Sequence, residues 1–245
     1  MGAVRKLARQ ILSLFYPKRC AFCGSVLKGD QAVCEKCAAT LPFIRGEACP
    51  HCGRAREYCC CSGRGFGFDR CVAPLYYEGA TRAGICRVKF HGKKGYITQL
   101  AELTADTVRR EYAGIAFDAA VAVPMSRREL RSRGFNQSAL FCRALCAELG
   151  IAFRGDLLQK PLDTRPQRSC KADQRWRNVS GVFTVRKPAS VSGKTILLVD
   201  DIITTGATLN ECAQVLKKAG AAHVCCAVIA AVRQKNARAV ASAIN

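Results

Sequence analysis

The sequence predicts an α/β protein in which helices flank a parallel sheet, preceded by a small cysteine-rich module. Residues 195–199 form an apolar run followed by two acids, a hydroxyl-and-glycine loop and a helical pattern, which is typical of a parallel strand buried on both faces. Three C-x-x-C pairs lie within residues 20–52. At 245 residues, of which 49% are hydrophobic, the chain is long enough for a full α/β domain and a small module.

We divide the chain into three parts. Residues 1–17 are expected to form an amphipathic helix, residues 18–69 the cysteine-rich module, and residues 70–245 the α/β domain. The second boundary follows residues 63–69, where the composition shifts to glycine and charge, as is typical of a connecting segment.

The helix expected at residues 1–17 carries basic residues and one apolar face. We interpret it as a docked helix because the small-residue cleavage site of a signal peptide is lacking; weak association with a membrane surface is the alternative. No run of about 20 apolar residues occurs, so no transmembrane segment is expected. The apolar face consists of Val4, Leu7, Ala8, Ile11, Leu12 and Phe15.

The cysteine-rich module is expected to bind two structural zinc ions. Each C-x-x-C turn places two thiolates on one side of a metal, and two such turns complete a tetrahedron. Residues 59–61 are three adjacent cysteines, and they cannot all bind a four-coordinate ion that already holds two thiolates. We choose Cys59 and Cys61 as the ligands and expect Cys60 to bind no zinc. The two ligand sets are Cys20, Cys23, Cys34 and Cys37, and Cys49, Cys52, Cys59 and Cys61.

The module has too little apolar sequence to fold unaided, so metal is expected to stabilise it. A redox-active or disulfide-rich segment is the alternative, which the short separated loops fit less well. The other cysteines lie mostly among apolar residues and are expected to be small core residues. Abundant unpaired thiols indicate a reducing, cytoplasmic location. These other cysteines are Cys71, Cys86, Cys142, Cys146, Cys212, Cys225 and Cys226.

Strand-like and helix-like patterns alternate along the α/β domain. Asn136 is expected to cap the helix that begins at Gln137. Residues 89–95 form a basic glycine loop suited to contact a phosphate through Lys89, and a solvated turn is an equal alternative. Further strands are predicted at residues 71–77, 117–123 and 221–232, and helices at residues 79–90, 97–112 and 137–149.

The loop after residues 195–199 is a candidate anion site. Backbone N–H groups of the loop and of the first helical turn lack intrahelical partners, and the helix dipole adds positive potential, so a phosphate monoester fits there. Asp200 and Asp201 would repel a second phosphate but accept hydrogen bonds from a diol. The implied ligand is a sugar phosphate, most simply a ribose 5-phosphate unit. The candidate residues are Asp200, Asp201, Thr204, Thr205, Gly206, Ala207 and Thr208.

Residues 199–208, VDDIITTGAT, resemble the phosphoribosyl pyrophosphate (PRPP) loop of type I phosphoribosyltransferases. That loop follows an apolar strand and consists of two acids, two apolar residues and a T-T-G-x-T-like segment, all present here. The resemblance implies that Asp200 and Asp201 bind the ribose hydroxyls, that residues 204–208 hold the 5-phosphate, and that Mg²⁺ accompanies PRPP. An ordinary buried strand with an acidic end is the alternative.

Residues 124–137 are predicted to form a basic loop at the carboxyl end of the strand at residues 117–123. Such a loop faces the phosphate loop across the sheet edge, where guanidinium groups match the oxygens of the PRPP pyrophosphate. An exposed basic connection is the alternative. The candidates are Arg127, Arg128 and Arg133, together with Lys89.

Residues 123–138, VPMSRRELRSRGFNQS, resemble a segment of the ComF family, and the T-x-x-Q at residues 164–167 and the R-x-x-N at residues 175–178 are similar to its downstream elements. The paired zinc ribbon and the PRPP loop follow in the same order, so the resemblance covers nearly the whole chain. Two departures stand out: the segment begins Val-Pro-Met, and three adjacent cysteines end the last zinc knuckle.

The formal net charge of +21 favours polyanions as partners, with a general solubility surface as the alternative. Residues 160–187 are rich in Arg, Lys and Gln and contain the only tryptophan. Basic residues interleaved with an aromatic ring suit single-stranded nucleic acid. The candidate contacts are Phe135, Gln167, Arg175 and Trp176, and packing of both rings in the interior is the alternative.

The ComF resemblance implies a protein that handles incoming single-stranded DNA during natural transformation, together with a helicase partner. The alternative is an active phosphoribosyltransferase of nucleotide or nucleobase metabolism. Such an enzyme would bind Mg²⁺-PRPP, hold the leaving pyrophosphate with metal and Arg or Lys, and stabilise an oxocarbenium-like ribose as a base attacks C1. Fold does not fix function, and no element of the sequence identifies an acceptor base.

Overall fold

The fold is described from a computed structural model, in residues 18–27, 31, 33–59, 61, 65–91, 95–161, 176 and 179–233. The helix expected at residues 1–17 lies outside these residues, as do Cys60, Gln167 and Arg175. Within the described ranges, every helix is too short or too polar to cross a membrane.

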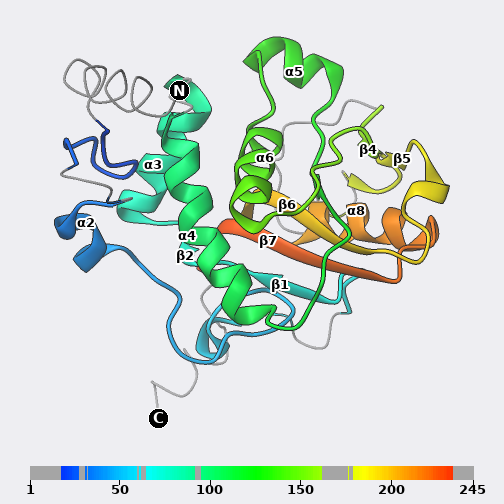
Figure 1. The fold of residues 1–245 in the computed structure, drawn as a ribbon, viewed down its shortest axis with the longest axis horizontal. Helices are drawn as coiled ribbons and strands as arrows, with labels where there is room; N and C mark the ends of the chain where they lie inside the picture. Colours follow the sequence, from blue (N-terminus) through cyan, green and yellow to red (C-terminus); the bar gives the residue numbers. More distant parts are fainter. Residues whose placement is uncertain are drawn as a thin grey trace, which may run out of the picture.

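A parallel sheet of five strands forms the centre of the molecule (Figure 1). The long strands β6 (Thr195–Ile203) and β7 (His223–Ala231) pair side by side, and β3 (Ala119–Ala122) flanks β6. On the other side of β7, β1 (Arg70–Val72) and β2 (Leu75–Tyr76) pair with two successive stretches of that strand. The carboxyl ends of parallel strands share one edge, so the segments after β3 and β6 are brought to the same side of the sheet.

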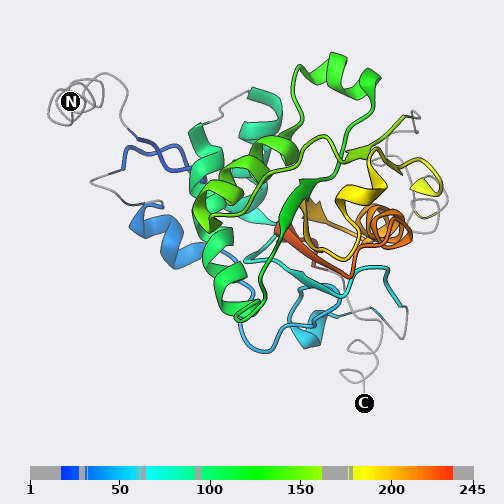
Figure 2. The same cartoon turned by 45° about the vertical axis from the view of Figure 1, so that its right-hand side comes forward.

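Helices cover both faces of the sheet, and Figure 2 shows the strands between the green α4 and α6 and the orange α8. Alternate residues of β6 enter two separate cores: Leu197 and Val199 pack with one helix layer, Ile196 and Leu198 with the other, as the period of two in a strand requires. The first layer contains α3 (Gly79–His91), α4 (Gly95–Glu111) and α6 (Gln137–Leu149), and the second contains α8 (Ala207–Lys218).

The sheet strands are apolar on both faces, as their sequence predicts for a parallel sheet covered by helices. Cysteines serve there as small core residues: Cys71, Cys225 and Cys226 pack within the sheet, and Cys212 packs from α8. The short remaining elements are α2 (Glu35–Thr40), η1 (Arg56–Tyr58), α5 (Arg127–Arg133), β4 (Leu158–Gln159), β5 (Thr184–Val185) and η3 (Pro188–Ser190).

The cysteine-rich module is joined to the sheet domain at several points. Phe43 forms an antiparallel bridge with Leu75 of β2, and the Cys71 N–H donates to the carbonyl of Pro50 at 2.7 Å. Within the module, the bridges between Arg19 and Val26 and between Ala48 and Ala55 form two small knuckles. Figure 1 shows the module, in blue to cyan, along α3, α4 and the β1–β2 edge.

Several element boundaries differ from the sequence prediction. The strand predicted at residues 71–77 is split into β1 and β2, where Pro74 lacks the N–H group that a sheet ladder needs. Strand β6 does not end at Val199 but continues through both acids, with Asp200 paired to Val228 of β7. The helix predicted at residues 79–90 is confirmed as α3, which extends to His91. Lys89 therefore lies in this helix, and residues 92–94 of the predicted glycine loop are outside the described residues.

The predicted basic loop at residues 124–137 contains a short helix, α5. Ser126 and Glu129 form a capping box at its start: the Glu129 N–H donates to Ser126 Oγ at 3.3 Å, and the Ser126 N–H donates to Glu129 Oε2 at 2.9 Å. Such reciprocal bonds satisfy two N–H groups that a helix start otherwise leaves unpaired. The predicted cap of α6 is confirmed, since Asn136 Oδ1 accepts from the Ala139 N–H at 3.2 Å.

Candidate functional site

The segment between β6 and α8 has the geometry of an anion-binding turn. Gly206 has φ +82° and occupies the N-cap position of α8, a left-handed conformation that favours glycine. The Ala207 N–H donates to Thr205 Oγ1 at 3.4 Å, and the Asn210 N–H begins the helical pattern by donating to the Gly206 carbonyl at 2.8 Å. Backbone N–H groups at such a helix start suit a phosphate.

Phe66 closes one side of this turn. A Cβ atom added to Gly206 would lie 2.8 Å from the Phe66 ring, so a larger residue at 206 meets both a steric and a backbone obstacle. Phe66 stacks on Phe68 with ring centroids 4.7 Å apart, and the Gly67 N–H donates to Asn210 Oδ1 at 2.7 Å. The segment between the two modules therefore packs directly against the start of α8.

The acid pair is held by the first turn of α6. The Ser138 hydroxyl donates to Asp200 Oδ1 at 2.7 Å, and the Gln137 amide donates to Asp201 Oδ2 at 3.2 Å. Asp201 is only 9% exposed, and both α6 side chains are buried. Buried hydrogen-bond donors fix the positions of carboxylates before a ligand arrives.

Sequence reasoning missed this role of Gln137 and Ser138, although both lie in the segment that carries the ComF resemblance. Gln137 also connects the acid pair to the basic segment, because the Arg133 guanidinium donates to Gln137 Oε1 at 3.3 Å. The structure thus joins Arg133, Gln137 and Asp201 in one chain of polar contacts.

The remaining predicted pyrophosphate residues occupy different positions. Arg127 and Arg128 are exposed at the start of α5, whereas Arg133 is its last residue. Lys89 lies near the end of α3, and its side chain is outside the described part of the structure. The structure therefore connects Arg133 to the acid pair and leaves Arg127 and Arg128 facing solvent.

The α5 segment is anchored by a partly buried ion pair. Lys160 Nζ lies 3.0 Å from Glu129 Oε2, and the lysine side chain is only 7% exposed. Burial raises the pKa of Glu129, but hydrogen bonds from Ser126 and the charge of Lys160 outweigh burial and hold that pKa below its usual value. Glu129 thus connects the basic helix to the chain after β4.

The two aromatic candidates for nucleic-acid contact are half-buried. Trp176 packs at the edge of the second core, with its ring centroid 6.1 Å from that of Phe66. Phe135 lies between α5 and α6. The described contacts favour a packing role for Trp176.

Both predicted cysteine sets gather as clusters. In each set the four sulfur atoms lie within 4.8 Å of one another: Cys20, Cys23, Cys34 and Cys37, and Cys49, Cys52, Cys59 and Cys61. Tetrahedral zinc takes four thiolates at this spacing, so the residues present fit structural zinc. The choice of Cys59 and Cys61 as partners of the third C-x-x-C pair agrees with this grouping.

The two clusters differ in their polar surroundings. In the first, hydrogen bonding with the hydroxyl and the backbone of Ser25 lowers the pKa of the Cys23 thiol to about 6. In the second, the pKa of the Cys52 thiol falls to about 4, chiefly through a hydrogen bond from the Cys61 thiol and, against the opposing effect of burial, through the backbone and guanidinium of Arg54. Burial raises the pKa of Cys37 in the first cluster and that of Cys49, to about 11, in the second, so the thiolate form is favoured at only some of the sulfurs.

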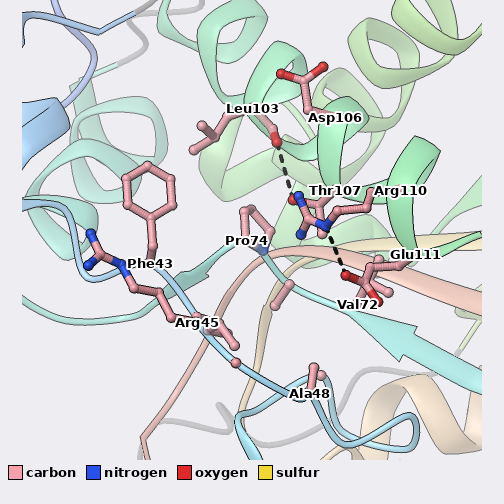
Figure 3. Close-up of a pocket in the computed structure, with 14 residues that line it drawn as sticks. Phe43, Arg45, Ala48, Val72, Pro74, Leu103, Asp106, Thr107, Arg110 and Glu111 are labelled. Atoms are coloured by element: carbon pink, nitrogen blue, oxygen red, sulfur yellow. Dashed lines mark hydrogen bonds and ion pairs between the residues drawn. The ribbon is translucent and has the colours of Figure 1, made fainter.

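A groove of about 500 Å³ lies between the module and the sheet domain, away from the phosphate loop (Figure 3). It is lined by the module segment from Phe43 to Ala48, by the β1–β2 connection and by the outer side of α4. Charged residues at its rim pair locally: Arg110 Nε lies 3.0 Å from Glu111 Oε1. Of the predicted site residues that the structure describes, none lines this groove.

An α/β domain with this acid pair and this turn before α8 is a phosphoribosyltransferase domain, and the two cysteine clusters in front of it form a double zinc ribbon. Family models agree with both assignments. Residues 147–245 match the phosphoribosyl transferase domain, and residues 11–87 match the double zinc ribbon domain.

Relatives match the chain across both modules. The DNA utilization protein YhgH of Salmonella typhi is 31% identical over 221 residues, which cover 89% of this chain and 92% of the relative. Competence protein F of Haemophilus influenzae is 27% identical over 86% of this chain and 95% of its own length. Competence protein ComFC of Bacillus subtilis is 27% identical over 80% of this chain and 82% of its own length. The chain belongs to the ComF family.

Proposed function

We propose that this protein binds PRPP through its phosphoribosyltransferase domain and handles single-stranded DNA during natural transformation, in the cytoplasm and with a helicase partner. The observation that carries the ligand assignment is the acid pair, which the first turn of α6 holds beside the phosphate loop through Gln137 and Ser138. The DNA assignment rests on the printed names of the relatives, a DNA utilization protein and two competence proteins, and on the net charge of +21.

Two kinds of protein group at the site would contact different parts of the ligand. Carboxylates accept hydrogen bonds from the ribose diol, and the N–H groups of residues 204–208 donate to the 5-phosphate. The pyrophosphate of PRPP needs cationic partners, for which Arg133, Arg127 and Arg128 are the candidates on the neighbouring segment. Mg²⁺, which prefers phosphate and carboxylate oxygens, would neutralise the pyrophosphate further when bound.

Calorimetric titration with PRPP and Mg²⁺ tests the ligand assignment. Asp200→Asn with Asp201→Asn should weaken binding by about 100-fold or more, because two charge-assisted hydrogen bonds to the diol are lost. Asp156→Asn is the matched control, since Asp156 is an exposed acid of the same domain that pairs only with Arg154 in the hydrogen bonds described. Equal affinity in the double variant and the control would remove the acid pair from the site.

Fluorescence anisotropy with labelled single-stranded DNA tests the second half of the proposal. If phosphates are contacted, affinity should fall steeply as salt rises, and Arg127→Ala with Arg128→Ala should make the salt dependence shallower. Arg109→Ala with Arg110→Ala removes the same charge from an exposed turn of α4 and serves as the control. Binding that ignores salt, or no binding at all, would contradict DNA handling.

An active phosphoribosyltransferase is the second candidate function, favoured by the same acid pair and loop but less supported by the names of the relatives. Its test is release of pyrophosphate from PRPP over a panel of nucleobases. Turnover with one base, abolished by Asp200→Asn and Asp201→Asn, would establish the enzyme. Binding of PRPP without turnover would favour the ligand-binding role.

A further inference from the structure

Arg54 lies in the knuckle that carries Cys49 and Cys52, and it is buried far more deeply than an arginine usually is. Only 2% of its surface is exposed, and it is one of the largest fully buried side chains in the described residues. A guanidinium in such a place needs several hydrogen-bond acceptors, because an unsatisfied buried charge is strongly unfavourable. The partners of Arg54 therefore indicate what holds it there.

Those partners are main-chain carbonyl groups at the ends of the two central strands. Arg54 Nε donates to the Val232 carbonyl at 2.7 Å, just after β7. Arg54 Nη2 donates to the Thr204 carbonyl at 2.5 Å and makes a longer contact of 3.5 Å with the Ile203 carbonyl, at the end of β6. One side chain of the zinc-ribbon knuckle thus reaches the first residue of the phosphate loop, 150 positions further along the chain.

The hydrogen bond to Thr204 has a consequence for the ligand side of the loop. In a planar trans peptide the C=O and the following N–H point in opposite directions. Because Arg54 fixes the Thr204 carbonyl, it also fixes the direction of the Thr205 N–H, which points away from the knuckle. Under the proposed function, this N–H is one of the donors that the loop would offer to the 5-phosphate.

The backbone around Arg54 is held on both sides. The Cys49 N–H donates to the Arg54 carbonyl at 2.7 Å, and the Gly53 N–H donates to the Cys49 carbonyl at 2.9 Å. Gly53 has φ +68°, and a Cβ atom there would lie 3.1 Å from main-chain atoms of Cys71 and Ala73. The turn between Cys49 and Arg54 is therefore closely seated against β1.

The charge of the second cluster also favours a cation at this position. A zinc ion bound by four thiolates carries a net negative charge, and Arg54 follows Cys52, one of the four, by only two residues. Arg233, the residue after Val232, stacks over Tyr58 at 4.3 Å and pairs with Glu78 at 2.9 Å. The second cluster is thus tied to the ends of both β6 and β7.

The first cluster is attached elsewhere. Gln99 of α4 accepts from the Ala21 N–H at 2.8 Å and donates to the Arg19 carbonyl at 2.8 Å. Arg87 of α3 donates to the carbonyls of Ala21 and Phe22. The first knuckle therefore packs on the helix layer, whereas the second packs on the strand ends and the loop.

We propose that the second zinc-ribbon knuckle is part of the phosphate site: Arg54 is a positioning residue that orients the Thr204–Thr205 peptide, so occupancy of the second metal cluster controls affinity for ribose 5-phosphate. This inference deepens the proposed function and rests on it. The first cluster has no such role and supplies matched controls.

Two pairs of variants test the inference, with calorimetric titration of ribose 5-phosphate as the first measurement. Arg54→Met should weaken binding roughly 10- to 100-fold, as expected for loss of charge-assisted hydrogen bonds, and Arg54→Lys should recover part of the loss. Arg87→Met, which removes the comparable arginine of the first knuckle, should stay within about twofold of wild type. Wild-type affinity in Arg54→Met would overturn the inference.

The second pair removes one metal ligand from each cluster. Cys59 and Cys34 are both half-buried ligands, so Cys59→Ser and Cys34→Ser are matched changes, and zinc content measured by mass spectrometry should fall in both. Only Cys59→Ser should weaken ribose 5-phosphate binding. Equal affinity in the two variants would overturn the inference even if Arg54→Met fails to fold.

Hydrogen–deuterium exchange without ligand separates failure of the inference from failure of the proposed function. Residues 203–208 should exchange faster in Arg54→Met and Cys59→Ser than in Arg87→Met and Cys34→Ser, because the loop loses its tie to the knuckle. If the wild-type protein binds no ribose 5-phosphate, the proposed function is wrong, and the inference that the second metal cluster controls affinity is wrong as well. If wild type binds and exchange is equal in all variants, only the inference is wrong.

Discussion

The cysteine-rich module and the sheet domain differ in the kinds of residue that they bury. In the sheet domain, residues 196–199 of β6 are fully buried between two helix layers, so apolar burial dominates. In the module, four of the buried residues are themselves cluster cysteines: Cys20, Cys37, Cys49 and Cys52. We therefore expect the module to depend on metal for its fold more than the sheet domain does, and, under the inference above, we expect Arg54 to transmit this dependence to the phosphate loop.

Removal of zinc should have the largest effect and should act on the module alone. Structural zinc sites contribute about 10–16 kcal/mol of apparent binding free energy in small domains, so a strong chelator should unfold the module while β6, β7 and their helices persist. Circular dichroism should retain most of the helical signal, and limited proteolysis should cut residues 18–61 first. Cooperative loss of the whole helical signal on chelation would contradict separate stabilisation.

Leu198→Ala should destabilise the sheet domain and leave the zinc sites intact. Leu198 is fully buried in the second core, so its truncation should lower the free energy of unfolding by about 2–5 kcal/mol. Zinc content should stay unchanged. Chemical denaturation and metal analysis provide the two measurements, and Leu130→Ala is the control because Leu130 is 44% exposed. Loss of zinc in Leu198→Ala would show that the two modules fold as one unit.

Glu129→Gln should give the smallest effect and a characteristic pH dependence. Because the folded-state pKa of Glu129 is lowered, its contribution to stability is present above the unfolded-state pKa and is lost as pH falls through the folded-state pKa. The variant should be less stable than wild type at neutral pH, and the difference should vanish in acid. Thermal melting across pH measures this, with Lys160→Met expected to remove part of the same contribution. A difference that persists in acid would assign the effect to packing.

Local patterns were sufficient to predict much of the sheet domain from the sequence. The apolar run before the acids predicted β6, and Asn136 predicted the start of α6, because strand burial and helix capping depend on neighbouring residues. Helix α5 was missed even though Ser126 and Glu129 have capping-box spacing, because its arginines were interpreted as a loop that holds pyrophosphate. The split between β1 and β2 was signalled by Pro74 but was read as one strand.

The long-range contacts of the site could not be predicted. The donors to Asp200 and Asp201 come from α6, more than 60 positions away, and Arg54 reaches Thr204 across 150 positions. No spacing rule connects residues so far apart. The cysteine grouping was predictable because C-x-x-C turns are local, and the choice of Cys59 and Cys61 agrees with the cluster that the described residues form.

Deep burial of the sheet cysteines has a practical consequence for handling this protein. Burial raises the pKa of Cys226 well above its ordinary value and that of Cys225 to about 11, so these sulfurs offer electrophiles almost no reactive thiolate. Alkylating reagents and peroxide should therefore modify the half-buried sulfurs of the module, such as Cys34 and Cys59, before them. Mass spectrometry of the labelled cysteines would therefore report how much zinc a preparation has lost, because the ribbon cysteines become labelled and the buried sheet cysteines do not.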